Sequence, residues 1–423
     1  MRELMRVCLN EWMKLVRRRR LWVASLLGVA MVGLFAYGTY HSYQMQQKYN
    51  SLAAWRQQLA ANRQQLADLR RQQQHPGKNN PESGTSDVVA RQIQEVQDSI
   101  RQLQQQISEE TESDAQWRQQ QAKSVREEQK SLARTQAQTA PASGLPAAQH
   151  QSDIAQTRLS LLSDSYRLTH GVRPLPSGSQ DPYSMVMEFT DFSASVFLPL
   201  LAVILAADFI SGESTSGTIK LLLVRPVPRW KVLLGKWLVA CLATALLTAG
   251  LLAVVWLIGC LQYGTHGAWQ PQVVGLSYQF QHFMANDGSS TNVVIPLLAH
   301  AHVLPMWAYV LASAGLEVVA MMVVATIALL CSTLFKSAMA STAAALGAVV
   351  IGFVVSQFLH GSRVVPLLFP THMNLASDWA GQTAQSLELS VSLGSGLCTL
   401  AVWGVLSLVG AFVCFVRKDV LNA

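Results

Sequence analysis

A polar segment bounded by Gly212 and Gly217 is where this sequence comes nearest to a phosphate-binding loop. Such a loop needs Gly-Lys-Ser/Thr at its second glycine, because backbone amides and the lysine ammonium hold the phosphates together. Here the second glycine is followed by Thr218, Ile219 and Lys220, and an apolar helix-length stretch precedes the segment where a strand is required. We therefore expect no nucleotide to bind to this chain, and no other segment shows the pattern.

A lone acidic residue, Glu317, lies deep inside a long apolar stretch. A carboxylate in hydrocarbon costs about 2.5–3.5 kcal/mol on insertion scales, so it must face a cavity or a partner rather than lipid. One interpretation places Glu317 on a path through the membrane or at a gating contact. The other is a protonated carboxyl group that is hydrogen-bonded to Ser313 or to a neighbouring helix.

The histidines and cysteines indicate little chemistry. His300 and His302 form an H-x-H pair that could bind a metal or respond to pH, but no cysteine or carboxylate lies near them at ligand spacing. Scattered histidines on a wet surface are the alternative, and we expect no metal site. The six cysteines are spread through the chain and none falls in residues 42–182, so they form no disulfide framework there.

Composition indicates a membrane protein. Half of the 423 residues are hydrophobic and 13% are charged, whereas soluble proteins average about 25% charged residues. This argues against a nucleic-acid-binding protein, despite the net charge of +7, and against a soluble enzyme. Stretches of about 20 apolar residues can cross the hydrocarbon core. The sequence predicts an all-α integral membrane protein with six transmembrane helices, at residues 21–41, 183–208, 237–261, 304–331, 337–359 and 391–416.

Lysine and arginine alternate between the connecting segments. They are frequent in one set and nearly missing from the other, where residues 262–303 have none and residues 360–390 have only Arg363. Because positive residues favour the cytoplasmic side, we expect a multi-pass membrane protein with both termini in the cytoplasm. The basic segments are residues 1–20, which form an amphipathic helix, 209–236, 332–336 and 417–423.

Residues 42–182 form a large Gln-rich insert after the first span, predicted to lie outside the cytoplasm. Two heptad-like seams predict helices that pair as an antiparallel coiled-coil hairpin. One runs from Leu52 to Leu69, and the other runs from Ile93 to Ile107 and continues loosely through Trp117 and Val125. A shorter third helix is expected near residues 153–168. A partly disordered Gln-rich spacer is the alternative that composition allows.

The segment from Ser211 to Lys236, SGESTSGTIKLLLVRPVPRWKVLLGK, lies between two spans. Its serines and threonine are good helix N-caps, and Pro226 and Pro228 end a short helix over residues 218–224. Such a helix at the membrane surface could bind a soluble partner. A simple re-entry turn with basic anchors at lipid headgroups is equally compatible with these residues.

Two strings carry a family resemblance. The first runs from Glu213 through SGTIKLLL to RPV and RWKVLLGK, and the second is NEWMKLVRRR at residues 10–19. With six spans and both ends inside, they resemble bacterial ABC-2 type transporter permeases, the membrane subunits of ABC exporters. The resemblance covers the membrane part, about two thirds of the chain, and the Gln-rich insert lies outside it.

That resemblance implies a non-catalytic permease that forms the substrate path as a homo- or heterodimer. ATP and Mg would be bound by a separate cytoplasmic ABC ATPase subunit and no cofactor by this chain. Glu317 becomes a transport-path or gating candidate, and an outside partner of the coiled coil is possible. The alternative is a membrane-anchored sensor or scaffold whose coiled coil binds a partner without transport. The resemblance assigns ATPase docking to Glu11, Trp12, Glu213, Gly217, Thr218, Ile219, Lys220, Leu221, Leu222 and Arg225.

Overall fold

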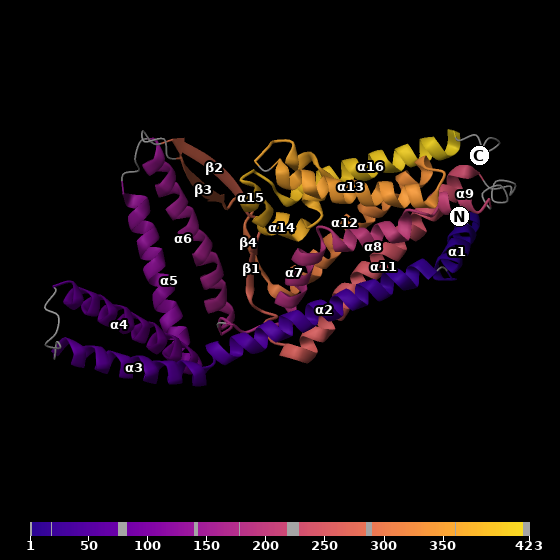
Figure 1. Ribbon diagram of the computed structural model, residues 1–423. Coiled ribbons are helices and arrows are strands. Elements are labelled where there is room, and N and C mark those ends of the chain that lie inside the picture. Colours follow the sequence, from indigo (N-terminus) through magenta and orange to yellow (C-terminus); the bar gives the residue numbers. More distant parts are fainter. Residues whose placement is uncertain are drawn as a thin grey trace.

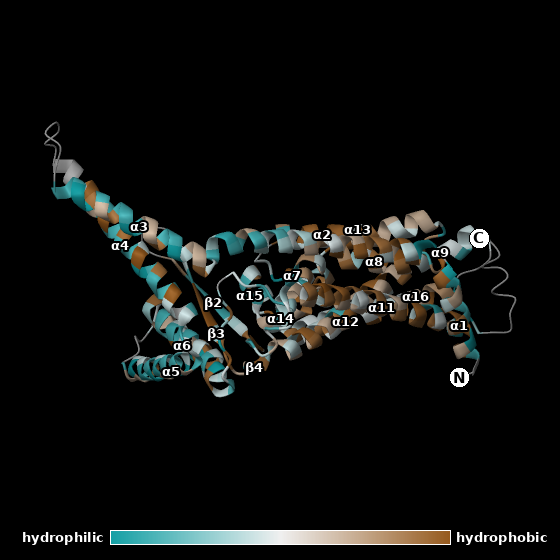
Figure 2. Cartoon of the chain, turned by 90° about the horizontal axis from the view of Figure 1, so that it is seen from below, coloured by the Kyte–Doolittle hydropathy of each residue, from teal (hydrophilic) through white to brown (hydrophobic). Residues whose placement is uncertain are grey.

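The computed structural model describes residues 2–17, 19–74, 83–138, 143–176, 178–217, 228–284, 290–359 and 361–417. A bundle of apolar helices is joined to a polar helical stalk, and the two differ sharply in hydropathy (Figure 1; Figure 2). We call the end of the bundle beside the stalk the stalk end. The opposite end, where α1 (Arg2–Arg17) lies, is the α1 end.

Five helices are long and apolar enough to cross a membrane, and a bent pair of shorter helices makes up to six within the described residues. The bent pair is α7 (Pro182–Ser193) and α8 (Phe197–Ala206). The chain is therefore a multi-pass helical membrane protein, as its hydropathy predicted. The five long helices are α2 (Arg19–Asn50), α11 (Arg229–Tyr263), α12 (Met306–Leu334), α13 (Ala338–Phe358) and α16 (Leu393–Arg417).

The bent pair turns by 66° at a break between its two helices. Pro199, in the first turn of α8, explains the break, because its ring would clash with the Ser195 carbonyl in a continuous helix. At the other end of α7, the carboxylate of Asp181 accepts hydrogen bonds from the backbone amides of Tyr183 (2.9 Å) and Ser184 (3.0 Å). This N-cap fixes where the helix begins.

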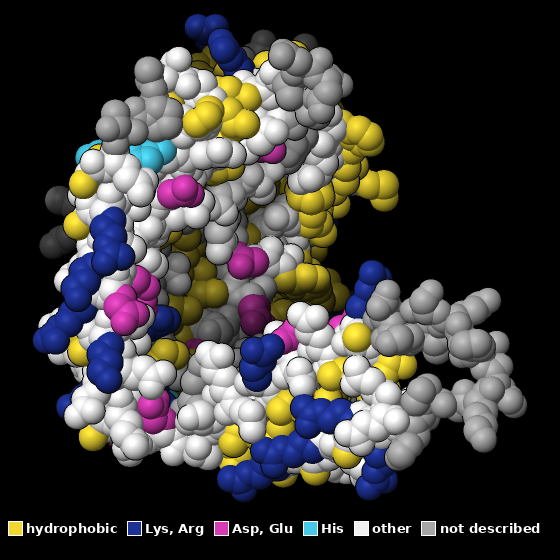
Figure 3. All heavy atoms as spheres, turned by 90° about the vertical axis from the view of Figure 1, so that its left-hand side faces the viewer, with side chains coloured by type: hydrophobic (Ala, Val, Ile, Leu, Met, Phe, Trp, Pro, Cys, Tyr) yellow, Lys and Arg dark blue, Asp and Glu magenta, His cyan; other side chains and the backbone are white. Residues whose placement is uncertain are grey.

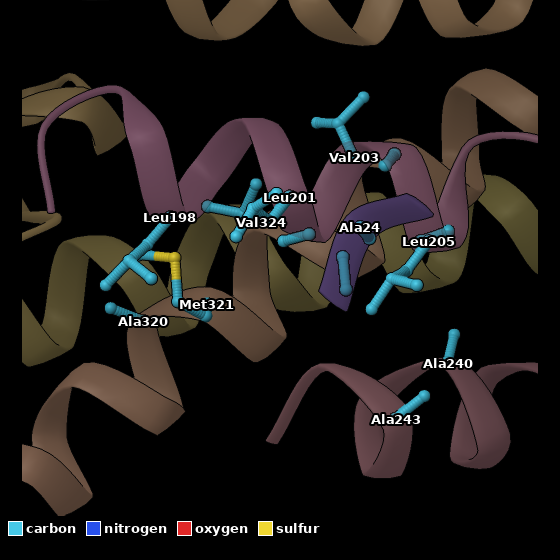
Figure 4. Packing of buried hydrophobic residues seen from close by; sticks show 14 of the residues in the cluster. Ala24, Leu198, Leu201, Val203, Leu205, Ala240, Ala243, Ala320, Met321 and Val324 are labelled. Atoms are coloured by element: carbon cyan, nitrogen blue, oxygen red, sulfur yellow. The ribbon is translucent and has the colours of Figure 1, made fainter. Parts of the chain in front are cut away.

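Helix α8 lies in the centre of the bundle and is apolar on all sides. Leu198 and Leu201 point toward Met321 and Val324 of α12, and the small residue Ala24 lets α2 approach closely (Figure 4). Ser341 of α13 donates a hydrogen bond to the Ala207 carbonyl just beyond α8. The small residues that open α13 therefore pack within this chain on that side.

The stalk consists of two helical hairpins. Helices α3 (Leu52–Gln74) and α4 (Ser83–Thr111) pack along the predicted seam, and α5 (Asp114–Ala137) packs against α6 (Leu145–His170). The expectation that the second seam runs on through Trp117 is wrong in one respect. Ser113 forms a capping box with Gln116, which starts a new helix. Asn62 pairs with Ser99 at 2.9 Å, so this polar position is satisfied within the seam.

The all-α prediction is wrong for the segment between α11 and α12, which contains two antiparallel strand pairs. β1 (Pro271–Val274) pairs with β4 (His302–Pro305), and β2 (Ser277–Met284) pairs with β3 (Ser290–Leu297). The physical signal is present in the sequence, because the first five residues of β2, SYQFQ, alternate polar and aromatic side chains with the two-residue period of a strand.

The remaining elements close the stalk end. Ser152 of α6 donates to the Val294 carbonyl of β3 at 2.8 Å, so the second hairpin rests on this sheet. Short helices fold against α12, α13 and α16 at the same end. These are η1 (Val365–Leu367), η2 (Phe369–His372), α14 (Leu375–Ala380) and α15 (Gln382–Leu387).

Candidate functional site

The residues singled out in the sequence meet at the α1 end of the bundle. Glu213 belongs to α9 (Ser211–Thr215), which directly follows the bent span, and Glu11 and Trp12 belong to α1. Gly217 ends this short helix in the left-handed region, with a φ of 69° that favours glycine. The other docking candidates, Thr218, Ile219, Lys220, Leu221, Leu222 and Arg225, lie outside the described residues.

The buried side chain of Lys236 connects α1 and α9 through ion pairs. It belongs to α11 and is only 1% exposed, while Glu11 and Glu213 are 4% and 5% exposed. Its Nζ lies 2.8 Å from Glu11 Oε2 and 2.8 Å from Glu213 Oε1, and it donates to the Phe209 carbonyl at 3.2 Å. Three segments that are far apart in sequence are thus held by one buried ammonium group.

A second cation completes what we call the ion cluster: Glu11, Lys14, Glu213 and Lys236. Lys14 Nζ lies 2.8 Å from Glu11 Oε1 and 3.3 Å from Glu213 Oε1. With two cations and two carboxylates, the cluster is neutral. Buried charges are tolerated only when they are paired and hydrogen-bonded, and both conditions are met here.

The pKa values in α1 reflect this pairing. Burial alone raises the pKa of Glu11, but the charges and hydrogen bonds of Lys236 and Lys14 outweigh it and hold the pKa below its ordinary value. Burial lowers the pKa of Lys14, but the hydrogen bonds and charges of Glu11 and Glu213 outweigh it and raise the pKa. Both side chains therefore stay charged at neutral pH.

Two features of the sequence position α1. Its buried residues repeat with the helical period, and a glycine of α11 lets the two helices cross closely. Cys8, Glu11, Trp12 and Leu15 recur at spacings of three and four, so they share one face, and Leu15 is 3% exposed. Gly235 lies where α1 crosses α11, because a Cβ added there would come within 2.7 Å of a methyl group of Val7. The glycine lets the two helices approach closely enough for Lys236 to reach Glu11.

Helix α9 is also tied to the turn between α12 and α13. Ser332 Oγ accepts hydrogen bonds from the backbone amides of Ile210 and Ser211, both at 3.0 Å. Thr215 Oγ1 donates to the Lys336 carbonyl at 3.3 Å and accepts from the Ala338 amide at 3.2 Å. A force on the segment after α9 would therefore act on α1, α11, α12 and α13 together.

Glu317 lies apart from this cluster, in the middle of α12. It is 1% exposed, and neither carboxyl oxygen has a hydrogen-bond partner in the described part of the chain. The hydrogen bond to Ser313 is not formed, since that hydroxyl is also without a partner there. Its helix, α12, packs against both helices of the bent span, α7 and α8.

A second buried pair, His372 and Asp378, has no sequence signal beyond the residue types. Both side chains are fully buried, and His372 Nδ1 lies 2.7 Å from Asp378 Oδ2 while Nε2 lies 2.8 Å from the Pro366 carbonyl. The His300–His302 pair gains no further ligand, and no group of three metal-binding side chains exists among the described residues.

The bundle and its bent span define a multi-pass helical membrane protein. A family model described as "ABC-2 family transporter protein" matches residues 5–420, and the chain belongs to this family. Membrane permeases of the family have no catalytic activity of their own and need no cofactor in this chain. The family resemblance seen in the sequence is thereby confirmed. Its extent was predicted too narrowly, because the family match runs through the Gln-rich insert, residues 42–182, as well as the membrane part.

One curated relative is similar over part of its length. A stretch of 104 residues is 32% identical to the uncharacterized protein YhcI of Bacillus subtilis (strain 168). This stretch covers 25% of the present chain and 32% of YhcI. The chain therefore matches about a third of the length of this relative. Its description assigns no activity that could be carried over.

Proposed function

We propose that this chain is the permease subunit of an ATP-driven exporter, forming the substrate path as a dimer and coupled to a separate ATPase subunit. Membership of the ABC-2 family implies an ATPase partner in general. The ion cluster is the observation that carries the more specific proposal. It braces α1 against α9 at the point where the predicted docking segment, residues 218–225, begins.

In this proposal the α1 end faces the cytoplasm, where the ATPase subunit is found. Lysine and arginine gather at this end, in α1, at the start of α11 and at the end of α16, as the positive-inside rule requires. The stalk then lies outside the cytoplasm. The lipid bilayer surrounds the five long helices and the bent pair.

The two groups of docking residues have different roles in this proposal. The side chains of Glu11 and Glu213 are buried, so they act within the chain by holding α1 and α9 together. Gly217 is exposed at the end of α9, and it leads into residues 218–225, which we assign to contact with the ATPase. Closure of the ATPase dimer would push on this segment, and the ion cluster would pass the displacement to α11. Alternating access of the path is the expected result.

The test is co-purification of this chain with a co-expressed cytoplasmic ABC ATPase subunit. Replacing residues 218–222 with alternating glycine and serine should abolish association, while the same replacement of residues 285–289 should not. ATPase association that survives the first replacement would contradict the docking assignment. Substrate-stimulated ATP hydrolysis by the reconstituted complex tests export itself. A complex whose ATPase activity responds to no transported compound would favour a membrane-anchored sensor or scaffold.

A further inference from the structure

The stalk contains a trough where its two hairpins meet. It consists of two adjoining cavities of about 500 and 350 Å³, both lined by Trp55, Glu110, Leu175 and Pro176. We call this trough the stalk cleft. Its walls come from α3, α4, α5 and the segment that follows α6, so it exists only in the folded stalk.

Two tryptophans give the stalk cleft its apolar surface. Trp55 of α3 is 6% exposed and Trp117 of α5 is 8% exposed. Indole N–H groups at such buried positions normally have a hydrogen-bond partner. Within the described part of the chain, neither indole nitrogen donates a hydrogen bond, and neither nitrogen is completely shielded from solvent. Both donors are therefore accessible to an acceptor outside the chain.

The uncompensated charge in the stalk cleft is negative. Glu110 and Glu112 line it, and neither carboxylate forms an ion pair with the residues that the structure describes. The arginine of the cleft, Arg173, is already engaged, since its Nη1 donates to the Glu112 carbonyl at 3.0 Å and lies 3.8 Å from Asp114. Seen from the stalk side, the molecule is hollowed, with acidic side chains inside the hollow and both acidic and basic side chains around its rim (Figure 3).

We propose that the stalk cleft binds a cationic peptide segment. Carboxylates attract lysine or arginine, and the faces of tryptophan rings stabilise a cation that lies over them. The free indole N–H groups can donate to the carbonyl groups of an extended peptide, and the elongated trough suits such a chain. An anionic peptide would meet two carboxylates without a free cation to offset them. The proposal concerns binding alone and stands independently of coupling to an ATPase.

The test uses the full chain in nanodiscs of zwitterionic lipid. The probe is a fluorescent peptide of alternating lysine and leucine, and its anisotropy reports binding after subtraction of empty nanodiscs. A matched peptide with glutamate in place of lysine is expected not to bind. Glu110→Gln with Glu112→Gln should weaken binding about tenfold, because each exposed ion pair contributes up to about 1 kcal/mol.

The matched control is Glu95→Gln with Glu127→Gln, which removes two exposed carboxylates from the stalk, one on α4 and one on α5, that do not line the cleft. This control should bind the lysine peptide as the unmodified chain does. Trp117→Phe keeps an aromatic ring but removes the indole donor, and it should also weaken binding. Equal affinity of the cleft and control variants, or equal binding of the glutamate peptide, would overturn the proposal. A circular dichroism spectrum of each variant shows that the stalk is intact.

Discussion

Lys236 offers the sharpest test of the ion cluster. Replacing it with methionine keeps most of the side-chain volume but removes the buried ammonium group that lies 2.8 Å from both Glu11 and Glu213, while the half-exposed Lys14 stays in place. Removing one partner from a buried ion pair typically costs about 3–5 kcal/mol, because the remaining charge is uncompensated. We expect a loss of stability in this range for Lys236→Met.

The pH dependence of stability should also change sign. In the unmodified chain the pKa of Glu11 is lowered, so its contribution is complete above the ordinary carboxyl pKa and is lost as pH falls through the folded-state value. Without Lys236, burial and the neighbouring carboxylate should raise the pKa of Glu11 above the unfolded value. Folding then takes up a proton, and the variant should become more stable as pH falls from about 8 toward about 5.5.

The assay is unfolding by SDS in mixed micelles, followed by circular dichroism. Lys231→Met is the matched control, because Lys231 is on the same helix and pairs at 2.8 Å with Glu3, whose side chain is 62% exposed. An exposed pair contributes about 0–1 kcal/mol, so this control should change little. Adding Glu11→Gln and Glu213→Gln to Lys236→Met should restore much of the stability. Equal losses for the two lysine variants would refute the reasoning.

Three further predictions concern other parts of the bundle. Burial lowers the pKa of His372, but its hydrogen bond to Asp378 and the charge of that residue raise the pKa overall. The stabilisation by this pair should therefore be complete below about pH 6.5, the ordinary histidine pKa, and be lost as pH rises. Asp378→Asn should flatten this pH dependence of the melting temperature. Gly259→Ala should lower the melting temperature, because its Cβ would lie 2.9 Å from the backbone of α7, whereas Gly250→Ala on the same helix meets no atom within 4 Å and should not. Glu317→Gln should leave assembly intact and change substrate-stimulated ATPase activity; unchanged transport and hydrolysis would remove Glu317 from the path.

The sequence predicted the long helices well because hydropathy over about 20 residues is a strong, local signal. It located the second span, residues 183–208, but not the 66° bend within it. Pro199 was the available signal, because proline disrupts a helix at a defined position. The strands were missed for a different reason: short alternating segments between spans are easily read as loops.

The ion cluster was only partly predictable. Glu11, Glu213 and Lys236 were each visible in family-like strings, but 225 positions separate Glu11 from Lys236. No local pattern indicates that such distant residues share one hydrogen-bonded group. The crossing at Gly235 brings them together, and it depends on tertiary packing. The same holds for His372 and Asp378, whose pairing requires an irregular turn that has no repeating pattern.

Helix α11 connects the two ends of the bundle. It has 35 residues, which corresponds to about 52 Å at 1.5 Å per residue. Lys236 holds the ion cluster near its beginning, while Gly259 packs against α7 near its end and Tyr263 contacts Tyr43 of α2, with ring centroids 5.1 Å apart. If α11 moves as a stiff rod, a displacement of α1 must reach the bent span and the base of the stalk. We therefore expect that in Lys236→Met the substrate no longer stimulates ATP hydrolysis, while the ATPase subunit still binds. The reason is that residues 218–225 contact the ATPase, whereas the ion cluster transmits the displacement to α11. Loss of binding and coupling together would instead place the ion cluster within the docking surface.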